Sequence, residues 1–388
     1  MRIGIYGGTF DPPHLGHIAA ASSAVNALGL EKLIMIPAGT PPHKKLESDS
    51  CSPDARLEMT RLAALEIPHA QVSDMETKRG GKSYTVDTVG ELLGEYPGSE
   101  LFILMGTDMF LSIESWKDFR RLIKLAAVAV FPRSPGEEVL IEESAAALHG
   151  KYGARVICVP SAAIRVSSSE IRIALPLRKG REALSDSIYT YIIKKRFYCA
   201  KPDLDWLREK ACAMLSEKRV SHVKGCEEEA ACLALRWGAD RDEAREAAIL
   251  HDITKRDTPD AHLQLCEKYG IITDNAEKAD FKLLHSKTGA AAARDLFGIS
   301  DEVYGAILWH TTGRAGMTLL EKIIYIADYI EPTRDFEGLE ELRRLAYSDI
   351  DKAMIVGLRM SLKDMHRRGI TPHERSVAAL RYLENINR

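Results

Sequence analysis

The chain changes its sequence pattern near residue 200, and this change constrains the fold more than any other feature. Before it, short apolar runs typical of strands alternate with helical patterns, an order that predicts a parallel sheet covered by helices. From about Asp203 onward the strand signal fades, and apolar residues recur at i, i+3 and i+4, as on one face of a helix. We therefore predict an α/β domain with a parallel sheet, followed by an all-α domain.

The expected boundaries follow from the same pattern. A chain of 388 residues is long enough for two domains of roughly 100–200 residues each. The last amphipathic helix of the first domain is expected over Ser185–Tyr198, so we expect domains at 1–198 and 203–388, with a linker at 199–202. Gly29 is expected to close a helix that begins near His17. Strands are expected at Ile3–Tyr6, Lys32–Ile36, Leu101–Met105, Ala127–Phe131 and Arg155–Val159.

The composition is that of an ordinary globular protein. Hydrophobic residues make up 45% and charged residues 28%, and the formal net charge is −3 without a long basic run, so we expect no nucleic-acid partner. The N-terminus does not resemble a signal peptide, and no apolar run reaches the roughly 20 residues of a membrane span. We expect a cytoplasmic protein with no membrane contact, and the sequence leaves open whether it forms a homo-oligomer.

The first candidate site follows the first expected strand. Gly7 and Gly8 allow a tight turn before a helix whose N-terminus favours phosphate. His14 and His17, on either side of Gly16, are spaced to donate hydrogen bonds to one phosphate during an in-line displacement. Either histidine alone is more often a turn or capping residue. The pattern is neither G-x-G-x-x-G nor a P-loop, which argues against hydride transfer and kinase chemistry.

The second candidate site lies in the helical half. His251 and Asp252 end an apolar run, where a carboxylate is costly unless it is paired or bound to metal. Thr318 and Glu321 form a capping box, and the helix that it starts carries Asp328 on an apolar face. A single histidine of this half is as easily a hydrogen-bonded core residue. Together, four imidazoles and two carboxylates suit two metal ions, such as iron or manganese. The set is His222, His251, Asp252, His285, His310 and Asp328.

The N-terminal motif resembles the H-x-G-H signature of nucleotidyltransferases, and residues 1–198 are similar to bacterial nicotinate mononucleotide adenylyltransferases. The resemblance implies a Rossmann-like sheet, the substrates ATP and nicotinate mononucleotide, Mg²⁺, and catalytic roles for His14 and His17. It implies ATP or phosphate contacts for Gly7, Gly8, Thr9, Phe10, Gly16, Lys44, Ser168, Ser169 and Arg172. It implies contacts to nicotinate mononucleotide for Tyr84, Thr85, Gly106, Asp108 and Trp116. Trp116 is equally explained as a helix residue packed on the sheet, and the acceptor might be another mononucleotide, such as the amidated one.

The C-terminal residues resemble the HD-domain phosphohydrolases, and in detail the symmetrical diadenosine tetraphosphatases with a di-iron site. The resemblance implies that Asp252 bridges two metals, that Lys255 and Arg314 hold phosphate oxygens, with Lys255 taking part in catalysis, and that diadenosine tetraphosphate or a related nucleotide is split into two ADP. Two alternatives remain open. This half might hydrolyse another phosphoester, or it might bind nucleotides as a regulatory module without cleaving them.

Overall fold

The computed structural model describes residues 1–39, 49–79, 81–160 and 166–387. The chain divides into two compact units, Met1–Lys201 and Pro202–Arg388, which we describe separately. Lys44, an expected ATP or phosphate contact, lies outside the described residues.

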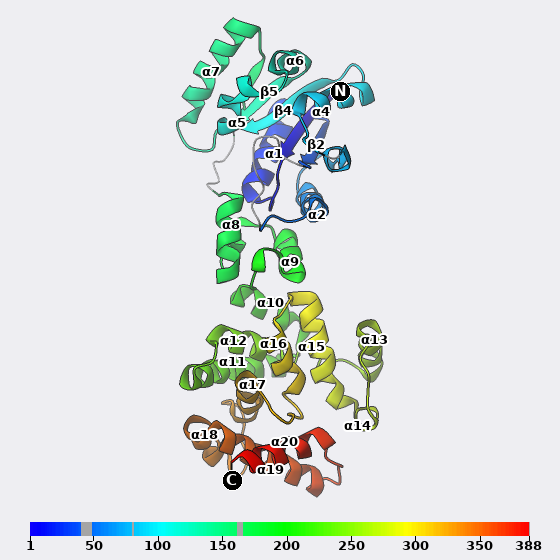
Figure 1. The fold of residues 1–388 in the computed structure, drawn as a ribbon, viewed down its shortest axis with the longest axis vertical. Coiled ribbons are helices and arrows are strands. Elements are labelled where there is room, and N and C mark those ends of the chain that lie inside the picture. The colour runs from blue at the N-terminus through cyan, green and yellow to red at the C-terminus, as the bar shows by residue number, and fades with distance from the viewer. Residues whose placement is uncertain (40–48, 80, 161–165, 388) are drawn as a thin grey trace. The chain divides into compact units, whose positions relative to one another are not determined.

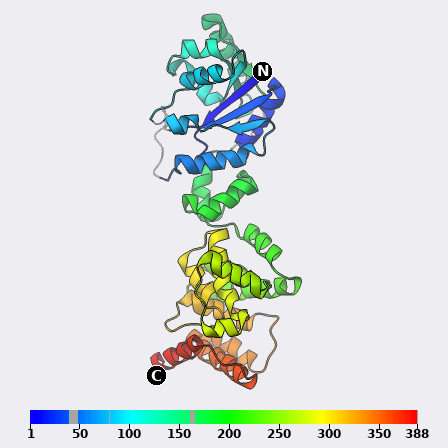
Figure 2. The ribbon, with the colours of Figure 1, turned by 90° about the vertical axis from the view of Figure 1, so that its right-hand side faces the viewer.

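The N-terminal unit is built on one parallel sheet of six strands in the order β3-β2-β1-β4-β5-β6 (Figures 1 and 2). The five expected strands are present, and the predicted fold class is confirmed. The sixth, β3, was missed because it has only three residues, one of which is Gln71, and shows no apolar run. The strands are β1 (Arg2–Gly8), β2 (Lys32–Pro37), β3 (Ala70–Val72), β4 (Glu100–Gly106), β5 (Ala127–Phe131) and β6 (Val156–Cys158).

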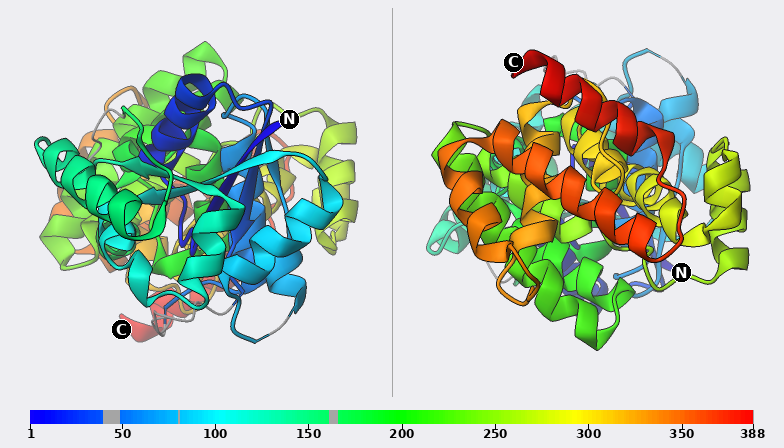
Figure 3. Two further views of the ribbon diagram at one scale, coloured as in Figure 1. Left: turned by 90° about the horizontal axis from the view of Figure 1, so that it is seen from above. Right: turned by 90° about the horizontal axis from the view of Figure 1, so that it is seen from below.

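Helices cover both faces of this sheet, with α1 and α4 on opposite sides (Figure 3, left). On β1, Ile3 and Ile5 join a buried cluster with α4 and α6. Gly4 faces the other way, where an added Cβ would lie 2.6 Å from Leu30 Cδ1. The strand order reverses at β1, between β2 and β4, and open sheets of this kind bind ligands at the carboxyl ends of the strands flanking that point.

The first and last helices of this unit can be compared with the predictions. The first helix begins at Leu15, two residues before His17 and thus close to the expected start, and Gly29 closes it with φ 56° as expected. The last helix ends at Lys195 and not at Tyr198, because Arg196 and Tyr198 adopt left-handed backbone angles. The helices are α1 (Leu15–Leu28), α2 (Pro53–Ala64), α3 (Met75–Arg79), α4 (Thr85–Glu95), α5 (Thr107–Leu111), α6 (Phe119–Leu125), α7 (Glu137–Tyr152), α8 (Ser168–Ala174) and α9 (Asp186–Lys195).

The C-terminal unit is helical throughout its described residues, as predicted. Its central helix, α17, packs against α11, α12, α16 and α19, and α19 packs against α18 and α20 (Figure 3, right). Within the described residues of the chain, no helix has the length and apolarity needed to cross a membrane. The helices are α10 (Leu204–Met214), α11 (Glu217–Trp237), α12 (Arg241–Leu250), α13 (Pro259–Tyr269), α14 (Asn275–Ala279), α15 (Leu284–Phe297), α16 (Asp301–Trp309), α17 (Leu319–Ile330), α18 (Leu339–Ser348), α19 (Ile350–Arg367) and α20 (Glu374–Ile386).

Candidate functional site

The two histidines of the N-terminal motif lie against each other at the start of α1. Their ring centroids are 3.8 Å apart, and the backbone N–H of His14 donates to Nδ1 of His17 over 3.2 Å. His14 caps the helix, and its carbonyl oxygen accepts from the backbone N–H of His17, which is why the helix begins at Leu15. Because Nδ1 of His17 accepts a hydrogen bond, the proton of a neutral ring is on Nε2.

The protonation of both histidines follows from their burial. Burial lowers the pKa of His14 to about 4, with Arg133 adding to the effect. Burial, His14 and Arg133 together hold the pKa of His17 well below its usual value. Both rings are therefore neutral near pH 7, and each offers one N–H as a hydrogen-bond donor.

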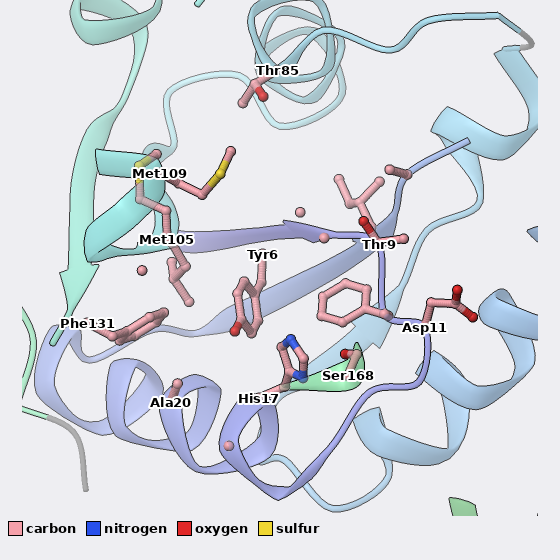
Figure 4. A pocket seen from close by; sticks show the side chains of 18 of the residues that line it. Tyr6, Thr9, Asp11, His17, Ala20, Thr85, Met105, Met109, Phe131 and Ser168 are labelled. Atoms are coloured by element: carbon pink, nitrogen blue, oxygen red, sulfur yellow. The ribbon is translucent and has the colours of Figure 1, made fainter. Parts of the chain in front are cut away.

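The serine-rich segment, 150 residues further along, lies beside this motif. Ser168 Oγ donates to the carbonyl oxygen of Pro12 over 2.9 Å, and Arg172 Nη1 donates to that of Asp11 over 2.8 Å. Ser167 and Glu170 form a capping box that holds the start of α8. Figure 4 shows Ser168 next to His17 at one end of a cavity. Hydroxyl, guanidinium and imidazole donors therefore gather at one place, as expected for a site that holds phosphates.

A cavity of about 870 Å³ extends from these groups along the carboxyl ends of the strands. Its walls include nearly all of the residues that the sequence indicated in this half. Asp108 is not among the described residues of the walls, and its largely exposed carboxylate pairs with Arg133, which is one of them. The expected residues on the walls are Gly7, Gly8, Thr9, Phe10, His14, Gly16, His17, Tyr84, Thr85, Gly106, Trp116, Ser168, Ser169 and Arg172.

Aromatic and apolar groups line much of the remaining cavity. Thr85 lies across the cavity from His17 with Tyr6 between them, and Phe131 lies to one side of Tyr6 (Figure 4). Trp116 lines the cavity and also packs on the buried cluster under the sheet, so both roles considered for it are compatible with its position. Lys117 Nζ lies 4.3 Å from the ring centroid of Tyr84. This wall is suited to a flat ring, which stacks on aromatic faces.

Two arginines support the cavity: Arg133, which the sequence indicated only as a weak phosphate-binding candidate, and Arg56, which the sequence did not indicate and which holds two residues of the cavity wall. Arg133 follows β5, and an added Cβ at Gly106 would lie 2.8 Å from its Nε, so Gly106 makes room for the guanidinium. Its position after Pro132 at a strand end was the available signal. Arg56 is fully buried and donates to the carbonyl oxygens of Thr9 and Ala38. A helix arginine gives no sequence signal for that role.

In the C-terminal unit, the six predicted ligand residues come together, and we call them the histidine–aspartate cluster. His222 lies on α11 and Asp328 on α17. His251 and His310 each follow the last residue of a helix, α12 and α16, and Asp252 comes directly after His251. We predicted that a buried helix presents His251 and Asp252, but the pair comes directly after the end of α12. All but Asp328, which is 21% exposed, are buried.

The imidazoles of the cluster are held in one tautomer. Nδ1 of His251, His285 and His310 each donates to the carbonyl oxygen three residues earlier, at distances of 2.7, 2.5 and 2.7 Å. Nδ1 of His222 lies 3.0 Å from the carboxylate of Glu331. Because a carbonyl or an ionised carboxylate only accepts, every Nδ1 carries the proton and every Nε2 presents a lone pair.

These lone pairs face one another and the carboxylates. Nε2 of His222 lies 3.1 Å from Asp328 Oδ1, and Nε2 of His285 lies 3.2 Å from Asp252 Oδ1. The Nε2 atoms of His285 and His310 are 3.0 Å apart. Asp252 Oδ1 is buried and accepts no hydrogen bond from the described residues. Lone pairs this close require a cation, and donors at right angles on an ion with bonds of about 2.1 Å lie about 3.0 Å apart. The donor set therefore fits metal ions.

Cations surround the two carboxylates of the cluster. Arg219 Nη1 lies 3.0 Å and Lys255 Nζ 3.6 Å from Asp252, and Arg334 Nη2 lies 2.5 Å from Asp328 Oδ1. Arg314, an expected phosphate contact, instead pairs with Glu321.

The sequence left open whether Cys226 affects the metal, and it gave no role to Arg219, Glu331 and Arg334. Cys226 Sγ lies 3.6 Å from His222 Nε2, within a group of possible ligands that also contains His251 and Asp328. Arg219, Glu331 and Arg334 contact the cluster from other segments, as described above. Cys226 lies four residues after His222, and Glu331 lies three residues after Asp328. Residues at these spacings are neighbours on a helix, so the sequence could have indicated both.

Comparison with known proteins gives the class of each unit. The family model described as Cytidylyltransferase-like matches residues 5–174, and the HD domain model matches residues 219–333, which include the whole cluster. The N-terminal unit thus has the fold and the motif of a nucleotidyltransferase. A probable nicotinate-nucleotide adenylyltransferase from Citrifermentans bemidjiense is 37% identical over 214 residues, covering 51% of this chain and 98% of that protein. One from Moorella thermoacetica is 38% identical over 213 residues, covering 54% and 96%. Through its N-terminal half, the chain belongs to the nicotinate-nucleotide adenylyltransferase family.

Two solved structures are similar to one half each. A predicted HD superfamily hydrolase involved in NAD metabolism, from Clostridium acetobutylicum, is 34% identical, with a TM-score of 0.47 over 48% of this chain and 100% of that one. The Plasmodium falciparum nicotinic acid mononucleotide adenylyltransferase, complexed with NaAD, is 20% identical, with a TM-score of 0.43 over 52% and 98%.

Proposed function

We propose that the N-terminal unit transfers the adenylyl group of ATP to nicotinate mononucleotide, giving nicotinate adenine dinucleotide and pyrophosphate. The observation that carries this proposal is the cavity with phosphate donors at one end and an aromatic wall at the other. Membership in the family supports the choice of acceptor.

In this proposal the residues bind and orient, and the acceptor phosphate itself attacks the α-phosphorus of ATP. The neutral rings of His14 and His17 donate hydrogen bonds to the charge that grows on the phosphate oxygens. Ser168, Ser169 and Arg172 bind the departing pyrophosphate, and Trp116 stacks on the pyridine ring. Among the described residues of this unit, no group of three metal-binding side chains gathers, so Mg²⁺ is expected to enter with the phosphates of ATP.

The test of this half compares two acceptors in the full chain. Pyrophosphate release is measured with ATP and either nicotinate mononucleotide or its amide, in the wild type and in His17→Asn. A higher kcat/KM for the acid, lost in the variant, supports the proposal. A higher kcat/KM for the amide would show that the amidated mononucleotide is the acceptor. Activity that survives in His17→Asn would overturn the catalytic role of the motif.

We propose that the C-terminal unit is a metal-dependent phosphohydrolase that splits diadenosine tetraphosphate, with one water, into two ADP. Support for metal comes from the lone pairs that face each other in the cluster, and support for a phosphate ester comes from Lys255 and Arg219 beside Asp252. Bound metal would supply Lewis acidity at the phosphate. The six ligand residues would hold it, while the two cations would bind phosphate oxygens and orient the chain of phosphates.

Metal content and products test this half together. Metal is measured in anaerobically purified wild type and in Asp252→Ala, and both are incubated with diadenosine tetraphosphate. About two ions per chain, their loss in the variant, and ADP as sole nucleotide product support the proposal. AMP plus ATP would exclude symmetrical cleavage. Bound metal without cleavage would favour another phosphoester, and nucleotide binding by a metal-free wild type would favour a regulatory module.

A further inference from the structure

One imidazole of the histidine–aspartate cluster is supported differently from the other three. Nδ1 of His251, His285 and His310 donates to a carbonyl oxygen three residues earlier, whereas Nδ1 of His222 donates to the carboxylate of Glu331. Glu331 is fully buried, just past the end of α17. Its carboxylate also accepts hydrogen bonds from the backbone N–H and the hydroxyl of Thr333, at 2.7 and 2.5 Å.

The packing on α11 makes room for this carboxylate. Gly225 lies three residues after His222, on the same face of the helix. An added Cβ at Gly225 would lie 2.5 Å from Glu331 Oε2. Three donors converge on the Glu331 carboxylate: the backbone N–H and the hydroxyl of Thr333, and Nδ1 of His222. A charged acceptor is thereby held in place behind His222.

The two ends of the cluster differ in charge as well. A carboxylate behind an imidazole makes the ring a more basic ligand than a carbonyl does. At the end formed by His285 and His310, Lys255 Nζ lies 2.9 Å from Nε2 of His285. A lysine cation at this position would repel a metal ion bound to His285. Arg334 pairs with Asp328 and lies 3.6 Å from Glu331, which offsets part of the negative charge near His222. Arg219 also lies on this side, 3.0 Å from Asp252 Oδ2, the oxygen that faces His222 and His251. Among the described residues, however, no arginine or lysine donates a hydrogen bond to a ring nitrogen of His222.

We propose that the two metal positions are unequal, with the ion at His222 and Asp328 bound more tightly than the ion at His285 and His310, and that Glu331 is the positioning residue that creates the difference. This inference rests on the proposed metal-binding function of the same unit. Glu331 acts through His222 and is not itself a ligand.

Titration of the metal-free full chain with Mn²⁺, followed by electron paramagnetic resonance of the free ion, tests the proposal without any substrate. The wild type is expected to bind in two steps. Glu331→Gln keeps an acceptor for Nδ1 but removes the charge, so the tighter step is expected to weaken about 10- to 100-fold while the weaker step stays. Glu227→Gln removes another buried carboxylate, whose partners Arg208 and Arg245 lie outside the cluster, and it is expected to leave both steps unchanged.

The possible outcomes are distinguishable. Two equal steps in the wild type, or equal weakening of both steps in Glu331→Gln, would overturn the inference and leave the metal-dependent function intact. No Mn²⁺ binding by the wild type would overturn both. If Glu331→Gln does not fold, as judged by circular dichroism, Thr333→Val removes one hydrogen bond to the same carboxylate, and a smaller loss confined to the tighter step is then expected.

Discussion

The hydroxyl of Tyr198 donates a 2.6 Å hydrogen bond to Oδ1 of Asp11 in the buried interior of the N-terminal unit. Tyr198 stands four residues before the start of the second unit, and Asp11 lies in the loop that leads to His14 and His17. The same Oδ1 accepts from the backbone N–H of Cys51. The end of this unit therefore holds the loop that carries its candidate catalytic residues.

Tyr198→Phe is expected to lower the free energy of unfolding of the N-terminal unit by about 1–3 kcal/mol, because a buried carboxylate loses a partner. Hydrogen exchange of peptides from β1 and α1 in urea measures the free energy of unfolding of this unit separately from the other. Tyr191→Phe is the control, since Tyr191 contacts Phe197 through its ring. Equal protection in the two variants would mean that the hydrogen bond contributes little.

Replacing either motif histidine should remove adenylyl transfer while leaving the fold in place. In His14→Asn and His17→Asn, kcat is expected to fall about 10²- to 10³-fold, the loss typical of one donor to a developing charge. Pyrophosphate release measures the rate. The metal content of the C-terminal unit serves as an internal control, because it should not change. A rise in KM for ATP with kcat unchanged would show that the histidine only binds substrate.

The N-terminal unit should lose stability as the pH falls from about 6.5 toward 4. Burial lowers the pKa of His14 to about 4, so between these values the unfolded chain binds more protons than the folded one. Each such histidine contributes at most about 1.4 kcal/mol per pH unit, and nothing above pH 6.5. Hydrogen exchange of β1 in urea across this range should show a shallower slope in His14→Gln. The exposed His69, changed to Asn, is the control, and an unchanged slope in His14→Gln would contradict the argument.

Trp116→Ala is expected to raise the KM for nicotinate mononucleotide about 10-fold, corresponding to a stacking contribution of about 1.4 kcal/mol, with the KM for ATP unchanged. Trp116→Phe should restore most of the affinity, because a flat ring remains. Trp116 also packs on the buried cluster, so a thermal scan of each variant separates a loss of stability from a loss of binding. Equal increases of both KM values would point to the packing role alone.

Local sequence determined the elements and the residue types of both sites. Apolar runs predicted five strands, Gly29 marked the end of α1, and Thr318 with Glu321 marked the start of α17, because these signals depend on neighbours within a few residues. The three-residue strand β3 was not predicted, because it is a strand through its pairing with β2 and has no apolar pattern of its own. The sequence placed the start of α1 within two residues, but it did not indicate the hydrogen bond between the His14 backbone and the His17 ring at that start.

The tertiary structure decided what supports those residues. Ser168 reaches Pro12 across 156 positions and Glu331 reaches His222 across 109, and no periodicity in the sequence specifies either contact. The sequence thus supplied six candidate metal ligands, but the direction of each lone pair depends on which acceptor lies behind each ring. That acceptor is a carbonyl three residues earlier for His251, His285 and His310, and a carboxylate from a distant segment for His222. The physical reason is that helix packing, which brings distant side chains together, sets the tautomer and basicity of a buried imidazole.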